Sequence, residues 1–165
     1  MFEKYGNFNS VEELNEKAAE LLAMKDYEGI KNLAKENGLD TEDAEDYIDG
    51  LINILATPLL AAYGKLSIES DELKPYEIMN DWITYIRATC EENPAMATAV
   101  RLKDKSLKGC IAELLKWSMK NAKPVDGDVL KACNINYKVT LGIPGIGTAK
   151  KIIREYYLGG ANESI

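Results

Sequence analysis

Histidine is absent from this chain of 165 residues, so it lacks the side chain most often used for proton transfer near neutral pH. The three cysteines, Cys90, Cys110 and Cys133, lie far apart with no paired spacing. Their odd number argues against a disulfide framework, and a zinc site would need all three scattered thiolates plus a carboxylate. We therefore expect no metal and no cofactor. An enzyme is the least favoured class of protein, because no catalytic residues can be assigned.

Long hydrophobic runs are also missing. The longest, Leu51–Tyr63, is interrupted by Asn53, Thr57 and Pro58 and is too short to cross a bilayer. The first residues carry no basic-then-apolar targeting signal. With 46% hydrophobic and 28% charged residues the chain can still bury a core, as one domain or two small ones. We expect a cytoplasmic protein with no membrane contact.

Charge is present in quantity, and it is separated along the chain. Residues 1–100 hold 21 acidic and 8 basic side chains, a net of -13, whereas residues 101–165 hold 6 acidic and 12 basic, a net of +6. Together these give the overall -7. Such asymmetry points to binding rather than catalysis, and the oppositely charged halves make a homodimer an expectation.

The first half predicts three helices. Ser10 with Glu13 has capping-box spacing and begins a helix to Met24, and Asp26 begins a second that ends near Gly38. A third is expected to start at Asp40 or Thr41, to be kinked or split at Pro58, and to end at Gly64. The polar residues 65–74 predict a linker.

The second half predicts further helices that begin at Pro75, at Asn93-Pro94, at Ser106 and at Asp126 or Asp128. The helix from Ser106 presents a core face of Leu107, Cys110, Ile111, Leu114 and Leu115. Residues Tyr137–Leu141 give a weak strand signal, and a last helix covers about Thr148 to Leu158. The expected fold is all-α, with about seven to eight helices and at most one short β element. We expect an acidic domain at residues 1–64 and a basic one at 75–165.

Six carboxylates lie within ten residues at the start of the third predicted helix. The helix dipole favours acids in a first turn, so part of this cluster needs no functional account. Positions 42, 45, 46 and 49 nevertheless follow helical spacing and predict one anionic stripe. Such a stripe can imitate a row of phosphates and compete for a basic groove, although a solvated helix face is the simpler interpretation. The partner-binding candidates here are Asp40, Glu42, Asp43, Glu45, Asp46 and Asp49.

Lysines gather around the helix that starts at Ser106. Lys105 and Lys108, with Arg101 and Lys103, precede and enter this helix, and Lys116, Lys120 and Lys123 continue the cluster. Few aromatic residues are interleaved, so a platform for stacking single-stranded nucleic acid is not supported. The cluster can contact phosphates or pair with the acidic half, and Lys105 and Lys108 join the partner-binding candidates.

The glycine-rich segment Gly142–Gly147 allows three interpretations. Its glycine spacing fits a phosphate-binding P-loop, but Thr148 stands where the lysine should be. It also matches the turn of a helix-hairpin-helix motif, in which main-chain amides bind a DNA phosphate. The third interpretation is a turn that lets the last helix pack closely. The nucleic-acid candidates are Gly145, Gly147, Lys150, Lys151 and Arg154.

Two segments carry a resemblance to a known family. They are Asn93-Pro-Ala-Met-Ala-Thr-Ala-Val and Lys105-Ser-Leu-Lys-Gly-Cys-Ile, followed by a lysine-rich helix end and an acidic restart at Asp126. Over roughly residues 80–135 the chain resembles the PcfK-like family of conjugative elements and phages, to which some Cas9-inhibiting (type II-A) anti-CRISPR proteins belong.

The resemblance implies a mobile-element protein that acts in a bacterial host cell and binds Cas9, or the Cas9–guide RNA complex, without performing chemistry. Cas9 holds nucleic acid in positively charged channels, for which an anionic helix would compete. The competing mechanism is suggested by the charge distribution and not by the family. The alternative hypothesis is a DNA-binding accessory protein of conjugation or replication, which uses the glycine-rich turn and the lysine-rich helices.

Overall fold

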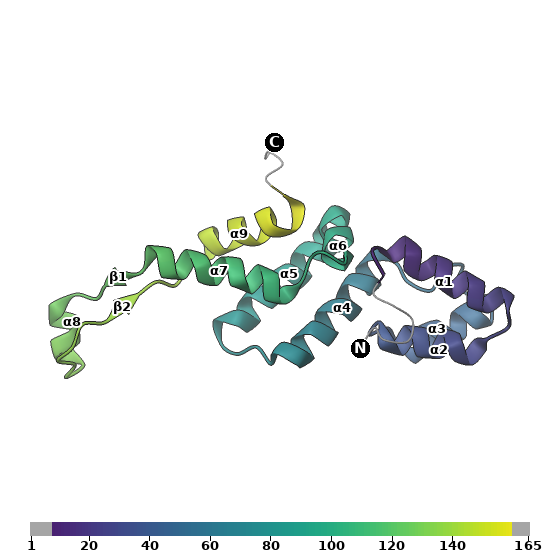
Figure 1. Cartoon of the computed structure of the whole chain (residues 1–165), viewed down its shortest axis with the longest axis horizontal. Helices are drawn as coiled ribbons and strands as arrows, with labels where there is room; N and C mark the ends of the chain where they lie inside the picture. The colour runs from purple at the N-terminus through teal and green to yellow at the C-terminus, as the bar shows by residue number, and fades with distance from the viewer. Residues whose placement is uncertain (1–7, 160–165) are drawn as a thin grey trace.

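The computed structural model describes residues 8–159, and its regular structure in that range is nine helices and one pair of two-residue strands (Figure 1). This confirms the mostly helical fold class. The elements are α1 (Val11–Ala23), α2 (Tyr27–Glu36), α3 (Thr41–Ile48), α4 (Pro58–Leu73), α5 (Ile78–Glu92), α6 (Pro94–Arg101), α7 (Leu107–Asn121), β1 (Lys123–Pro124), α8 (Gly127–Ala132), β2 (Thr140–Leu141) and α9 (Ile146–Leu158).

The first three helices form a small N-terminal core. The Ser10 hydroxyl accepts a hydrogen bond from the Glu13 amide, and the Asp26 and Asp40 carboxylates cap α2 and α3 in the same way. The sequence predicted the first two caps and left the third open between Asp40 and Thr41, of which Asp40 is the cap. Apolar residues at helical spacing on α1 and α2 then bury one face of each helix, chiefly Val11, Leu14, Ala18, Leu21, Ile30, Leu33 and Ala34.

The connection from α3 to α4 splits the third predicted helix, which is one of the two outcomes expected at Pro58, but the break already begins after Ile48. After α3 the chain turns at Gly50, where φ is 75°, and runs irregularly until Thr57 caps α4. Pro58 is the first residue of α4, a position where its missing amide hydrogen costs nothing. The Asn15 side chain fixes the approach by exchanging two hydrogen bonds of 2.8 and 2.9 Å with the main chain of Ala56.

Helix α4 joins the two halves of the molecule. Its Ala61 lies in the N-terminal core, whereas Ala62 and Leu66 lie in the second core. The prediction of a linker at residues 65–74 was wrong, because α4 continues to Leu73 and buries Lys65, Leu66 and Ile68. Gly64 was predicted to end a helix, but it lies inside α4.

The second core is larger and is built from α4, α5, α6, α7 and α9. The predicted caps at Asn93 and Ser106 are confirmed, and Pro94 begins α6. Leu107, Cys110, Ile111 and Leu114 face this core as expected. Leu115 does not, because its side chain is 57% exposed.

An arm projects from this core at the end away from α1–α3 (Figure 1). It consists of β1, α8 and β2, in which Lys123 pairs with Leu141 and Pro124 with Thr140. No residue from 122 to 143 is buried, so the arm has no core of its own. None of the helices of residues 8–159 is long and apolar enough to span a bilayer.

Candidate interaction surfaces

The acidic cluster lies on α3, and its outer members share one exposed face. Glu42, Glu45, Asp46 and Asp49 are exposed, while Ala44 and Tyr47 turn the opposite face of α3 into the N-terminal core. We call these four exposed residues the acidic stripe. The other two acids do not belong to this stripe. The Asp40 carboxylate accepts a hydrogen bond of 3.2 Å from the Glu42 amide, and Asp43 is half-buried.

The acidic stripe is not neutralised by the basic half of the same molecule. Among the described residues its one ion pair joins Glu45 to Lys31 of α2 at 2.8 Å. The other ion pairs of residues 8–159 are local, and none joins α3 to the second half of the chain. Helix α3 and the arm lie at opposite ends of an elongated molecule (Figure 1).

The two lysines predicted beside Ser106 have different surroundings. Lys105 is half-buried: its ammonium donates a 2.8 Å hydrogen bond to the Tyr156 carbonyl and lies 5.1 Å from the centre of the Tyr156 ring. This residue therefore holds α9 against the start of α7. Lys108, one turn later, is exposed. The structure does not bring either lysine near the acidic stripe.

The glycine-rich turn leads directly into α9. Gly145 precedes the helix and Gly147 lies in its first turn, with open space where side chains would stand. A helix-hairpin-helix needs a helix immediately before this turn, and the chain has β2 there instead. Lys150 lies over the Tyr85 ring at 5.0 Å, and Lys151 is 3.8 Å from Glu155. Arg154 is exposed.

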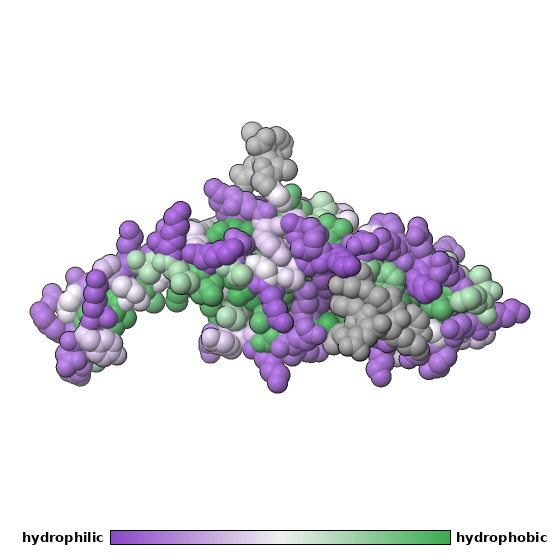
Figure 2. Space-filling view, viewed as in Figure 1, coloured by the Kyte–Doolittle hydropathy of each residue, from purple (hydrophilic) through white to green (hydrophobic). Residues whose placement is uncertain are grey.

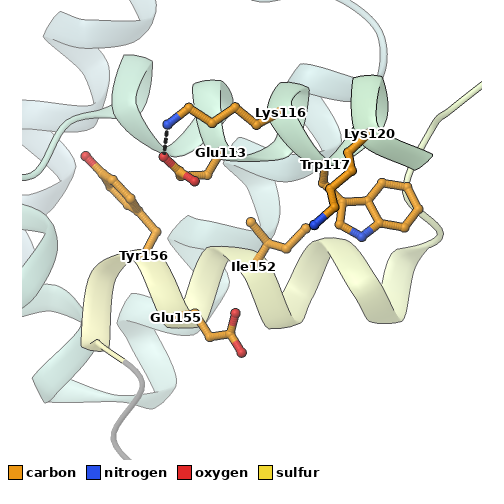
Figure 3. Close-up of a pocket in the computed structure, with 7 residues that line it drawn as sticks. All are labelled: Glu113, Lys116, Trp117, Lys120, Ile152, Glu155 and Tyr156. Atoms are coloured by element: carbon orange, nitrogen blue, oxygen red, sulfur yellow. Dashed lines mark hydrogen bonds and ion pairs between the residues drawn. The ribbon is translucent and has the colours of Figure 1, made fainter. Parts of the chain in front are cut away.

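A groove of about 500 Å³ lies between α7 and α9 (Figure 3). Its apolar part is formed by Trp117, Ile152 and Tyr156, and lysines and glutamates surround this part. Lys116 pairs with Glu113 at 2.6 Å and Glu155 lies 3.8 Å from Lys151, whereas Lys120 has no ion pair among the described residues. No nucleophile stands beside a base here, so the groove offers a binding surface rather than a reaction centre.

A second groove, of about 330 Å³, lies between α5 and the start of α9. Trp82, Tyr85, Ile146 and Ile153 give it an apolar lining. The Tyr85 hydroxyl is buried there without a hydrogen-bond partner among the described residues. Of the glycines in the turn before α9, Gly142 is the one in close contact, because a side chain there would overlap the Ser118 carbonyl oxygen of α7.

Sequence reasoning missed a buried polar cluster where the two cores meet. The Lys65 ammonium donates to the carbonyls of Val100 at 3.0 Å, of Leu102 at 2.5 Å and of Lys105. It therefore serves the free carbonyls at the end of α6. Burial lowers the pKa of Lys65 to about 8, while the nearby Glu69 carboxylate acts in the opposite direction.

Two further residues complete this cluster. One turn along α4 from Lys65, the Glu69 carboxylate accepts a 2.9 Å bond from the Leu107 amide at the start of α7, and burial raises its pKa. The Arg101 guanidinium is buried and donates to Asn37 of α2 at 3.1 Å and to the Phe8 carbonyl at 3.2 Å. The sequence around Lys65 gave no signal that this lysine would bind main-chain carbonyls, because its partners are distant in sequence.

Two of the three cysteines offer little chemistry in the folded state. Cys90 and Cys110 are buried, and burial raises the pKa of their thiols to about 11 and about 12. Cys133 is exposed on the arm. Within residues 8–159, no three potential metal ligands of the His, Cys, Asp and Glu types gather closely enough to hold an ion.

Fold and surfaces together define an elongated all-α protein whose two small cores share one helix. Its most prominent exposed features are the acidic stripe at one end and a lysine-rich helix and arm at the other. Comparisons of the chain with protein-family models, with curated proteins and with solved structures find no match.

Proposed function

We propose that this protein is an anti-CRISPR protein of a phage or other mobile element, which binds and inhibits Cas9 or the Cas9–guide RNA complex in a bacterial host cell. Two lines of reasoning support the proposal. One is the resemblance of residues 80–135 to the PcfK-like family. The other is the acidic stripe, which has the charge and exposure required to compete for a positively charged nucleic-acid channel.

The observation that carries the proposal is the state of the carboxylates on α3. Glu42, Asp46 and Asp49 are exposed and have no ion pair among the described residues, so their charge is available to a partner. A stripe neutralised by the lysines of α7 would have no such availability. Electrostatic attraction of this kind mainly raises the association rate and the selectivity for a partner.

Apolar contacts must supply much of the remaining affinity. Leu51 and Ile54 follow α3 in the chain and are 73% and 47% exposed. Exposed apolar residues that directly follow a charged helix supply the two kinds of group that protein interfaces combine in their centre and rim. We place the partner-binding surface on α3 and on these two residues, with Lys108 outside it.

The alternative, a DNA-binding accessory protein, has less support. The turn at Gly145 lacks the preceding helix, and Lys150 is already placed over an aromatic ring. This alternative predicts a mobility shift with duplex DNA that falls steeply as salt is added. The homodimer expected from the opposite charges of the two halves stays a prediction.

The test is inhibition of guided DNA cleavage by purified Cas9, with co-purification of the two proteins as a second readout. The stripe variant Glu42→Lys/Asp46→Lys/Asp49→Lys should inhibit far less than the unchanged protein. The control Glu16→Lys/Asp71→Lys/Glu72→Lys replaces three other exposed acids and changes the net charge by the same amount as the stripe variant. It should inhibit as the unchanged protein does. Absence of both inhibition and co-purification for the unchanged protein would remove the proposed function. Equal inhibition by both variants would remove the acidic stripe from it.

A further inference from the structure

The outward face of α7 is exposed along its whole length. Its exposed residues recur at intervals of three and four, which places them on one side of the helix. The opposite side holds Cys110 and Leu114 in the second core. We call this exposed side, including Lys123 just beyond the helix, the α7 face; its members are Lys108, Ala112, Leu115, Lys116, Met119, Lys120 and Lys123.

The centre of the α7 face is apolar and its rim is basic. Leu115 and Met119 are 57% and 75% exposed, and Leu141, 60% exposed, lies beside Lys123 in the strand pair. Figure 2 shows hydrophobic residues at the surface along α7 and toward the arm, between hydrophilic ones. Neighbouring exposed apolar side chains of this size are typical of a docking surface.

The charge of the rim restricts the class of partner. Lys108, Lys120 and Lys123 form no ion pair among the described residues, and Lys116 is paired with Glu113 of the same helix. A partner must therefore bring acidic groups around an apolar centre. Phosphates of a nucleic acid would match the lysines but would leave Leu115 and Met119 in water, which disfavours that occupant.

The chain itself carries a surface of the required kind. The acidic stripe of α3 is followed in the chain by the exposed Leu51 and Ile54, and the Leu51 amide donates a 2.8 Å hydrogen bond to the Asp46 carbonyl. This surface lies on the outside of the N-terminal core, at the other end of the molecule from the outer half of α7 (Figure 1). This surface cannot reach the α7 face of its own molecule without disrupting the fold. The same surface of a second copy can.

We infer that the protein self-associates, with the α7 face of one copy packed against the acidic stripe, Leu51 and Ile54 of a second copy. The apolar centres bury one another and the lysines meet carboxylates, an arrangement of core and rim that is common in interfaces. If the two copies run antiparallel, one pair forms this contact twice and closes the assembly. The inference does not rest on the proposed function, but self-association would cover the stripe and compete with any other partner for it.

Sedimentation of the full chain over a hundredfold range of concentration tests the inference, at low and at high salt. The average mass should rise with concentration, less so at high salt. The variants Glu42→Lys/Asp46→Lys/Asp49→Lys and Lys108→Glu/Lys120→Glu/Lys123→Glu should each stay monomeric, because each carries two surfaces of like charge. An equimolar mixture of these two variants should associate, because each basic surface of the first variant can then bind an acidic surface of the second. Circular dichroism confirms that each variant is folded.

Matched controls separate this contact from general charge effects. Lys25→Glu/Lys74→Glu/Lys103→Glu changes three other exposed lysines and should associate as the unchanged protein does. Leu115→Ser/Met119→Ser should weaken association at both salt concentrations. A monomer at every concentration would overturn the inference, whether or not the protein then bound nucleic acid. Failure of the mixture to associate, or equal loss of association in the lysine control, would overturn it as well.

Discussion

Among single residues, Lys65 has the most constrained surroundings. It is 5% exposed, yet its ammonium group serves three main-chain carbonyls near the end of α6 and lies 3.9 Å from the Glu69 carboxylate. Glu69 in turn serves the first amide of α7. Two residues one turn apart on α4 thus fix the end of one helix and the beginning of the next.

Removing that ammonium should destabilise the fold strongly. We predict that Lys65→Met lowers the free energy of unfolding by about 3 kcal/mol, because buried carbonyls lose their donor and Glu69 loses its nearby cation. Lys74→Met, at an exposed position, should change it by less than about 0.5 kcal/mol. Urea denaturation measures both. Equal stability of the two variants would show that the ammonium has no structural role.

We expect the buried thiols to make the folded protein less stable at alkaline pH. Cys110 has its pKa raised to about 12 by burial, so above pH 9 the unfolded chain loses a proton that the folded protein keeps. Raising the pH there favours the unfolded state, at about 1 kcal/mol per pH unit for one such thiol. In reducing buffer, the stability of Cys110→Ala should therefore fall less steeply between pH 9 and pH 11 than that of the unchanged protein. Parallel curves would contradict the assignment.

At the level of elements, α4 depends on a close backbone approach. A side chain at Gly64 would overlap the carbonyl oxygen of Asn37 and the main chain of Gly38, where φ is 70°. The turn between α2 and α3 can lie against α4 only if position 64 is glycine.

We predict that Gly64→Ala lowers the free energy of unfolding by about 2 kcal/mol or more, because main chain rather than a flexible side chain must move. Gly127→Ala provides the control, since a side chain there meets nothing within 4 Å. Gly127→Ala should leave the free energy of unfolding unchanged, and thermal unfolding measures both variants. Wild-type stability of Gly64→Ala would mean that the two cores are not in close contact through this glycine.

The arm should be dispensable for folding, because none of its residues is buried. We predict that replacing residues 126–138 by Asn-Gly, a pair suited to a tight hairpin turn, changes the free energy of unfolding by less than about 1 kcal/mol. Chemical denaturation followed by circular dichroism measures the change. A large loss of stability would show that the arm contributes to the second core.

Most helix starts could be predicted from the sequence because capping is local chemistry. The start expected at Pro75 was wrong: α5 begins at Ile78, and Glu77 before it forms no side-chain cap hydrogen bond. Ser10, Asp26, Asn93 and Ser106 each bond an amide within three residues. Pro58 was expected to kink or split the third helix, and the split is confirmed, but the early end of α3 at Ile48 was not predicted. Gly64 and Lys65 could not be assigned, because their partners are Asn37, Gly38 and residues 100–105, which only the tertiary fold brings near.

At the scale of the whole molecule, shape separates the charges that the sequence places in two halves. The acidic stripe was correctly placed on one exposed helix face, because helical spacing determines which residues share a face. The basic cluster was less predictable: Lys105 is held by Tyr156, a residue 51 positions away, and Leu115 is exposed rather than buried. An elongated arrangement leaves the stripe far from the arm, where it is free for a partner.

We propose that this exposed stripe is the docking surface for Cas9. The most direct measurement is the affinity of the Cas9–guide RNA complex for the protein across a series of salt concentrations. We expect the affinity to fall as salt rises, and Glu42→Lys/Asp46→Lys/Asp49→Lys to bind about tenfold more weakly at low salt, with a flatter salt dependence. The control Glu16→Lys/Asp71→Lys/Glu72→Lys should match the unchanged protein. Unaltered affinity and salt dependence in the stripe variant would contradict the account.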